Sequence, residues 1–233
     1  MENRRASGVI SRSWSPDVAS PAPPAHIPAG FAPAVTNAAA ITIFSDFASP
    51  YSFLAESALG QLEPGIASVS YRATPSQGRR LLLEAAEWED LASVAGDEGT
   101  VLRMPAATPA TGKAHEAALF ARGAGREADL RRAIFTGLWK NQADIGRIDV
   151  LCEIAGSIGL DAGELKIALD IDLHADEVSA DARLAHRLGI AETPVTYIGT
   201  GPRATVVKGA YTSNQLRALL QKSSALTQAG DHG

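Results

Sequence analysis

The stretch ITIFSDFASPYSFLAE, residues Ile41–Glu56, decides the fold of this chain. Its first part, Ile41–Phe44, is β-branched and aromatic, which predicts a buried strand. Ser49 is a favourable residue for capping the start of a helix, and Pro50 suits the first helical position because its missing N–H would have no partner there. The stretch therefore predicts a strand that leads directly into a helix, with the residues SPYS (49–52) at the junction.

The rest of the chain predicts an α/β protein. A second strand is expected over Ile66–Ala73, and a largely helical block follows it. The segments PVTYIG and ATVVKG flank TGPR as a predicted hairpin, and SNQLRALLQKSS predicts a last helix. This order of elements is that of a thioredoxin-like fold with a helical insertion at about 74–175.

Composition divides the chain into three parts. Residues 1–39 are rich in Pro, Ala and Ser, so we expect a flexible extension that buries too little apolar surface to fold. Residues 40–223 form the predicted domain, and 224–233 are expected to be a flexible tail. Hydrophobic residues make up 45% of the chain and charged residues 20%, which supports a substantial core.

Charge and cysteine content exclude several classes of function. The formal net charge of −5 disfavours nucleic acid as a partner. Cys152 is the single cysteine, so the chain cannot form an intramolecular disulfide or a cysteine-rich metal site. No apolar run approaches the roughly 18 residues of a membrane span, and the N-terminus has no continuous apolar segment typical of a secretory signal. We therefore expect a cytoplasmic protein with no membrane partner and no bound metal.

Three segments together resemble a known family. SDFASPYSF, LGIAETPVTYIG and VVKGAYTSNQLRALL are similar to the DsbA-like branch of the thioredoxin superfamily, over about Ile41 to Leu220. The middle segment AIFTGLWKNQADIGRIDVLCEIAGSIGLD resembles FrnE-type members of that branch. SPYSFLA is more similar to 2-hydroxychromene-2-carboxylate isomerases and kappa-class glutathione transferases.

The resemblance implies roles for the junction. Ser49 and Ser52 occupy the positions of the two cysteines of redox members, and a hydroxyl cannot exchange disulfides. In isomerase and transferase members a serine at the first position contacts the glutathione sulfur, which implies that Ser49 is catalytic and stabilises a thiolate. Pro50 and Tyr51 would then lie at a glutathione site. Thr193 and Pro194 match the loop whose proline is cis and whose backbone pairs with a bound peptide or glutathione.

Two functions remain open at this stage. The resemblance favours a glutathione-dependent isomerase or transferase that acts on a small hydrophobic substrate. The alternative is a redox-inactive thioredoxin-fold binding protein, because KGAYTSNQ stands where the isomerases and transferases have a Trp-Gly-x-Asp-Arg-like segment. A DsbA- or FrnE-type oxidoreductase follows from the fold alone and is disfavoured by the missing cysteine pair. Relatives often dimerise through the helical block, so a homodimer is a further expectation.

Other polar and aromatic residues have competing interpretations. Ser49 could act only as a helix cap, and Ser52 could simply fill the space of a cysteine. The main interpretation of Asp46 is that it merely marks the end of the strand, and the alternative is that its side chain is a buried polar partner. The helical histidines, His115, His174 and His186, are expected on solvated faces, and Cys152 is expected to have no role. Trp88 and Trp139 are candidates either for the core or for an apolar cleft beside the helical block.

Overall fold

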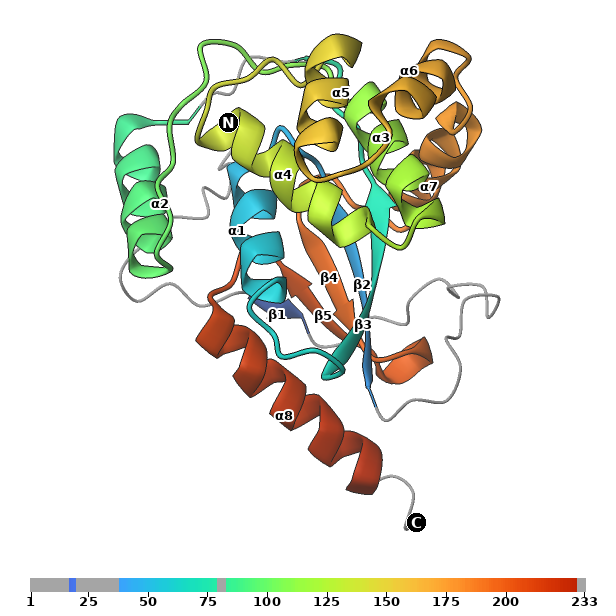
Figure 1. Ribbon diagram of the computed structural model, residues 1–233. Coiled ribbons are helices and arrows are strands. Elements are labelled where there is room, and N and C mark those ends of the chain that lie inside the picture. The colour runs from blue at the N-terminus through green and yellow to red at the C-terminus, as the bar shows by residue number, and fades with distance from the viewer. Residues whose placement is uncertain (1–16, 20–37, 79–82, 230–233) are drawn as a thin grey trace, which may run out of the picture.

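The computed structural model describes residues 17–19, 38–78 and 83–229. Its centre is a five-stranded sheet in the order β1-β5-β4-β2-β3, in which β2 and β3 are parallel and the other neighbours are antiparallel (Figure 1). The predicted strands are all present. The strands are β1 (Asp17–Ala19), β2 (Ala39–Ser45), β3 (Ala67–Ala73), β4 (Val195–Ile198) and β5 (Thr205–Lys208).

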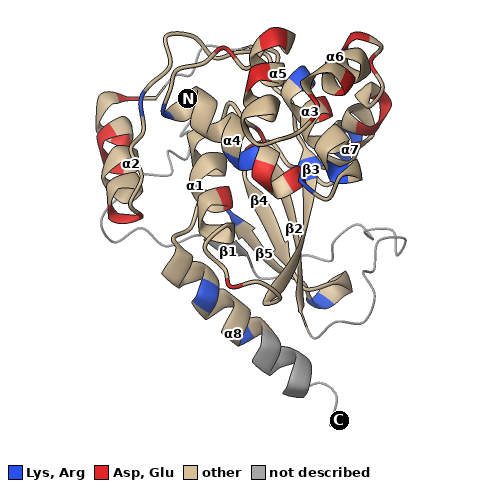
Figure 2. Ribbon diagram, in the orientation of Figure 1, with Lys and Arg blue, Asp and Glu red and all other residues tan. Residues whose placement is uncertain are grey.

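The β2 strand lies inside the sheet, between β4 and β3, because its side chains are apolar enough to be covered on both faces. Ile41 pairs with Val69 of β3 on one side and with Ile198 of β4 on the other. The predicted hairpin forms β4 and β5, joined through a short 3₁₀ turn over Gly201–Arg203. Lys and Arg, Asp and Glu lie mostly on the helices rather than on the strands, as Figure 2 shows.

Helices surround this sheet in the predicted order (Figure 1). The first, α1, follows β2 as expected and ends at Leu59, with Gly60 as its C-cap. The helical insertion contains five helices, α2 to α6, and α7 precedes β4. The helices are α1 (Pro50–Leu59), α2 (Ala85–Asp97), α3 (Gly112–Gly123), α4 (Glu127–Trp139), α5 (Ile148–Ser157), α6 (Ala162–Asp170), α7 (Ala175–Arg187) and α8 (Ser213–Ala229).

The two ends of the chain are described only in part. Most of the expected extension 1–39 lies outside the described residues, but Asp17–Ala19 form the edge strand β1 against β5, and β2 begins at Ala39. At the other end α8 continues to Ala229, so the predicted tail from 224 is helical as far as that residue. Residues 230–233 lie outside the described part.

The main hydrophobic core joins the helical insertion to α1. Phe53 and Leu54 of α1 pack in one buried cluster with Ile134 and Leu138 of α4. A second cluster joins the sheet to α1 and α8, and Leu216 of α8 is fully buried in it. The α1 helix therefore contributes to both clusters, which fixes its position between the insertion and the sheet.

A buried ion pair adds a polar link between α1 and α4. Arg131 donates from Nε to Oε2 of Glu56 at 2.8 Å and from Nη2 to Oε1 at 2.6 Å. Ser45, at the end of β2, donates to Glu56 at 2.6 Å and accepts from Arg131 at 2.9 Å. The guanidinium also lies over the rings of Phe47 and Tyr71, 4.7 and 4.6 Å from their centroids. These contacts satisfy a charge that is 2% exposed.

Candidate functional site

The junction between β2 and α1 has the predicted geometry. Ser49 is the N-cap of α1, with extended backbone, and its Oγ accepts the backbone N–H of Ser52 at 3.2 Å. Pro50 takes the first helical position. The first turn of α1 carries no acidic side chain, so nothing in it opposes an anion at the positive end of the helix dipole.

The loop before β4 completes this site. The Thr193–Pro194 peptide bond is cis, as predicted. The Ser49 hydroxyl donates to the Thr193 carbonyl at 3.0 Å, a contact between residues 144 positions apart in the chain. Ser49 and Thr193 are both partly exposed, whereas Pro194 is buried. The fold therefore brings four of the predicted residues together: Ser49, Pro50, Thr193 and Pro194.

Tyr51 lies at the rim of the site and is bound to the insertion. Its hydroxyl donates to the Glu87 carboxylate of α2. Burial is the largest cause that raises the pKa of Tyr51 above its usual value, followed by the hydrogen bond and charge of Glu87 and by the charge of Glu192. The phenol is thus a neutral donor at neutral pH, and two carboxylates lie on its side of the site.

Ser52 and Asp46 lie beneath the start of α1. Ser52 is fully buried, where it fills an interior position, and its Oγ accepts the backbone N–H of Asp46 at 3.3 Å. The Asp46 carbonyl in turn accepts the N–H of Ser49 at 3.0 Å. The Asp46 carboxylate accepts the Thr111 hydroxyl at 2.6 Å and is 7% exposed. The main interpretation of Asp46, as merely the end of the strand, is therefore wrong, and the alternative of a buried polar partner is confirmed.

His115 was wrongly predicted to lie on a solvated helix face. It is 1% exposed, its ring lies 4.7 Å from that of Phe47, and its Nε2 is 3.5 Å from Oδ1 of Asp46. At that length the contact is weak, and neither ring nitrogen has a good hydrogen-bond partner within the described residues. The overlooked signal was the alanine-rich α3, which is buried on most of its faces and leaves little solvated surface for a histidine.

His115 should make the fold sensitive to acid. Burial is the main cause that lowers its pKa below 6.5, against the opposing effect of Asp46. Below about pH 6.5 the unfolded chain therefore binds a proton at His115 that the folded chain does not bind. The free energy of unfolding is unaffected by this group above about pH 6.5, and it decreases by up to ~1.4 kcal/mol for each pH unit below that value. Urea unfolding at about pH 7.5 and about pH 5.5 should show a smaller acid loss for His115→Phe than for the wild type.

Exposed His186 provides the control for this measurement, since His186→Gln should leave the acid loss unchanged. An acid loss that is identical in His115→Phe and the wild type would show that His115 is not the group responsible.

The tryptophans and the cysteine are not brought to the junction as ligand-binding groups. Trp139 is fully buried in the core, so the cleft interpretation is wrong for it, and its Nε1 donates to the Phe47 carbonyl at 2.9 Å. Trp88 is partly buried against the same core. Cys152 is partly buried on α5, and burial raises the pKa of its thiol, which disfavours a reactive thiolate.

Two hollows lie away from Ser49. One of about 490 Å³ lies between α4 and α5, and another of about 230 Å³ lies between α1 and α4; Ser49 lines neither. Within residues 17–19, 38–78 and 83–229, no three His, Cys, Asp or Glu residues are grouped to hold a metal ion. Across those same ranges, every helix is too short or too polar to cross a bilayer.

A comparison with protein families covers the junction and most of the described fold. The model of the DSBA-like thioredoxin domain matches residues 40–221. The chain belongs to the DsbA-like thioredoxin family. None of the curated protein sequences matches it.

Solved structures share the fold of this DsbA-like domain at low sequence identity. A probable DsbA oxidoreductase from Streptomyces coelicolor is 23% identical, with a TM-score of 0.64 over 80% of this chain and 90% of that one. A 2-hydroxychromene-2-carboxylate isomerase is 15% identical, with a TM-score of 0.64 over 83% and 99%. The cytosolic disulfide reductase DsbM from Pseudomonas aeruginosa, 15% identical, has a TM-score of 0.60 over 83% and 98%, and a structure of it with GSH also matches.

Proposed function

We propose that this DsbA-like protein is a glutathione-dependent isomerase or transferase that acts on a small hydrophobic substrate. The observation that carries the proposal is the Ser49 hydroxyl at the start of α1, 3.0 Å from the carbonyl that precedes the cis proline. A hydroxyl in this place can bind a substrate-borne sulfur, although it cannot itself exchange disulfides.

The chemistry follows from a turn of the Ser49 hydroxyl. On binding, its proton would leave the Thr193 carbonyl and point to the glutathione sulfur, while Oγ keeps the N–H of Ser52. A charge-assisted hydrogen bond contributes about 1.5–3 kcal/mol, which would lower the pKa of a thiol by about one to two units. From about 8.5, this gives a substantial thiolate fraction at neutral pH.

The bound thiolate would then perform the reaction. It adds to a conjugated double bond of the substrate, forming a carbon–sulfur bond and placing the electron pair on the conjugated system. Rotation about the new single bond followed by expulsion of the thiolate restores the double bond in the other geometry, so glutathione is regenerated. A transferase would instead keep the carbon–sulfur bond and protonate the carbanion.

Charges at the rim suit one end of glutathione. Glu87 and Glu192 both act on Tyr51 at this side of the site, and glutathione carries an ammonium group at its γ-glutamyl end. Two structures with a similar fold support the proposal: one is the 2-hydroxychromene-2-carboxylate isomerase, and the other is DsbM with GSH. A cytoplasmic location forms part of the proposal, because glutathione keeps thiols reduced in that compartment.

Calorimetric titration of glutathione into wild type and Ser49→Ala tests the proposal. The wild type should bind at millimolar concentration or tighter, more strongly as the pH rises toward the thiol pKa, and Ser49→Ala should weaken binding about tenfold or more. Asp161→Ala is the matched control: it removes another helix cap, one that accepts the N–H groups of Gly163 and Glu164 in α6, and should bind normally.

A second candidate, a redox-inactive binding protein, is favoured by the fact that the Ser49 hydroxyl already has both a donor and an acceptor. Absence of heat at saturating glutathione in the wild type would overturn the glutathione proposal and favour this alternative. Equal binding by wild type and Ser49→Ala would reject the role given to the hydroxyl.

A further inference from the structure

An apolar ridge lies on the exposed side of α6. Ile167, Ile171 and Leu173 are 64%, 62% and 56% exposed, and they make up half of the six large hydrophobic residues that are exposed within the described ranges. Ile167 and Ile171 are four positions apart, and the Ile171 N–H donates to the Ile167 carbonyl at 3.2 Å, so their side chains share one face of the helix. We call these three side chains the α6 ridge.

The opposite face of α6 holds the helix in the molecule and leaves the ridge outside. Leu165 and Leu169 are buried in the main core, and α6 packs against α3 and α5. Figure 1 shows α6 at an outer corner of the helical insertion, away from the sheet. Single exposed apolar side chains are ordinary on protein surfaces, but grouped ones are typical of interaction surfaces.

We propose that the α6 ridge packs against the α6 ridge of a second copy of this chain, in a weak dimer whose two α6 helices run antiparallel about a two-fold axis. The axis passes between Ile167 and Ile171, so each of these residues lies opposite the other one in the partner. The inference goes beyond the proposed function and does not depend on it, since it uses neither Ser49 nor glutathione.

The charges beside the ridge suit a second copy. Lys166 and Asp170 lie together on one side of the ridge, 2.5 Å apart, and their side chains are 59% and 46% exposed. The two-fold rotation places this side of α6 against the same side of the partner helix and reverses the direction of that helix. Lys166 therefore comes beside Asp170 of the partner subunit, and Asp170 comes beside the partner's Lys166, which gives opposite charges on each side of the axis.

A lipid surface fits these charges less well. The α6 helix and the three residues after it carry the acids Glu164, Asp170 and Asp172 and one cation, Lys166. Helices that lie on a membrane surface are instead rich in Lys and Arg, which are attracted to anionic lipids. The net charge of −5 on the whole chain acts in the same direction.

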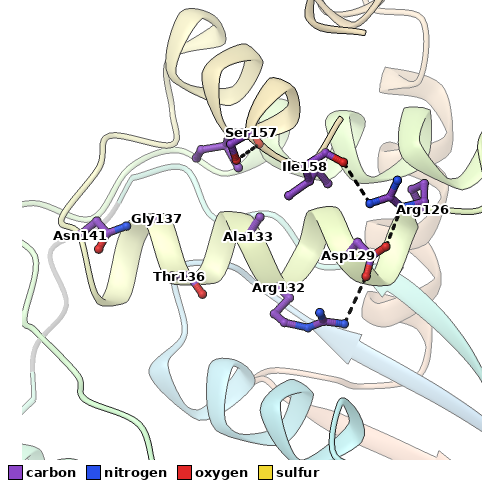
Figure 3. Close-up of a pocket in the computed structure, with 10 residues that line it drawn as sticks. Arg126, Asp129, Arg132, Ala133, Thr136, Gly137, Asn141, Ser157 and Ile158 are labelled. Atoms are coloured by element: carbon purple, nitrogen blue, oxygen red, sulfur yellow. Dashed lines mark hydrogen bonds and ion pairs between the residues drawn. The ribbon is translucent and has the colours of Figure 1, made fainter. Parts of the chain in front are cut away.

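The hollow of about 490 Å³ between α4 and α5 is a less suitable place for the ridge of another copy. Figure 3 shows polar groups at its rim: Arg126 donates to Asp129 at 2.6 Å and to the Ile158 carbonyl at 3.0 Å, and Arg132 donates to Asp129 at 3.3 Å. An isoleucine side chain in this hollow would remove water from these groups without offering a polar partner. Such a contact would also join two different surfaces, which builds open chains unless its rotation closes a ring.

The size of the ridge sets the strength of the dimer. A standard interface buries roughly 800 Å² on each partner, and three side chains at one short helix supply less than that. We therefore expect monomers and dimers to exchange in solution, and the dimer fraction to increase with protein concentration.

Sedimentation equilibrium of the full chain over about 5–500 µM tests the proposal. The mass of the wild type should increase from that of one chain toward that of two. Ile167→Glu should weaken association about tenfold or more, because it places two carboxylates close to the axis and removes apolar contact. Val101→Glu is the matched control: Val101 is 66% exposed, so the variant has the same charge change on a similarly exposed residue outside α6, and it should associate like the wild type.

A charge exchange tests the two-fold arrangement itself. Lys166→Glu alone should weaken the dimer, because two acids then meet beside the axis. Lys166→Glu combined with Asp170→Lys should restore it, because the cation and the anion have only exchanged places. Amide chemical shifts in ¹⁵N-labelled wild type should change with concentration over residues 166–172.

Three results would overturn the proposal. The mass of a single chain at every concentration would show that the ridge does not bind a second copy. Equal association of the wild type and Ile167→Glu, with folding verified by circular dichroism, would show that any contact between copies lies elsewhere. Masses that grow beyond two chains would show an open contact between unlike surfaces instead of the two-fold one.

Discussion

A Ser49→Cys, Ser52→Cys double variant is expected to catalyse thiol–disulfide exchange, which no pair of side chains in the natural sequence can perform. The first position is partly exposed at the start of α1, beside the cis Pro194 loop, and the second is buried three residues later. A helix N-terminus lowers a thiol pKa; a shift from about 8.5 to about 7 gives roughly tenfold more thiolate at neutral pH. The measurement is the rate of insulin reduction in the presence of a small dithiol.

The controls for this variant isolate the pair. Every variant should also carry Cys152→Ser, so that the natural thiol takes no part. Ser49→Cys alone should react with iodoacetamide but should not form an intramolecular disulfide. A folded double variant that reduces insulin no faster than this single variant would show that the junction does not hold the two side chains in an exchange-competent arrangement.

Arg131→Ala is expected to be the most destabilising single substitution considered for this protein. It leaves Glu56 as a buried carboxylate without its cation, and removal of one partner of a buried pair costs about 3–5 kcal/mol. The measurement is the free energy of unfolding in urea at neutral pH. Replacing both partners, as Glu56→Met with Arg131→Leu, should recover much of the loss because no charge then remains buried.

The adjacent residue supplies the comparison. Arg132 is well exposed, so Arg132→Ala should change the free energy of unfolding by less than about 0.5 kcal/mol. If Arg131→Ala and Arg132→Ala are equally mild, the link between α1 and α4 does not depend on the ion pair.

The strand–helix junction could be predicted because its signals are local. Ser49 and Pro50 favour a helix start whatever surrounds them, and the β-branched run before them favours a strand. Asp161 at the start of α6 is another local signal of this kind, since its side chain accepts the N–H groups of Gly163 and Glu164. The proximity of Ser49 to Thr193 was implied by the family resemblance rather than by a local pattern, since the two are far apart in the sequence.

The polar residues inside the molecule could not be predicted in this way. Arg131 and Arg132 are neighbours in the sequence, yet one is 2% exposed and the other lies in solvent, because successive residues on a helix point about 100° apart. Only the position of Glu56 on a packed helix decides which arginine turns inward. His115 and Asp46 come into contact for a similar reason. Their contact depends on how α3 packs against the end of β2, and the sequence of neither segment alone predicts that packing.

The sharing of α1 between two hydrophobic clusters bears on how the molecule can open locally. The α3, α4 and α5 helices bury their apolar side chains in the same cluster as Phe53 and Leu54, so they cannot separate from α1 without exposing that cluster to water. Trp139 adds a bond from the end of α4 to the carbonyl two residues before Ser49. The insertion therefore behaves as part of one cooperative unit with the helix that carries Ser49, rather than as a lid that swings over it.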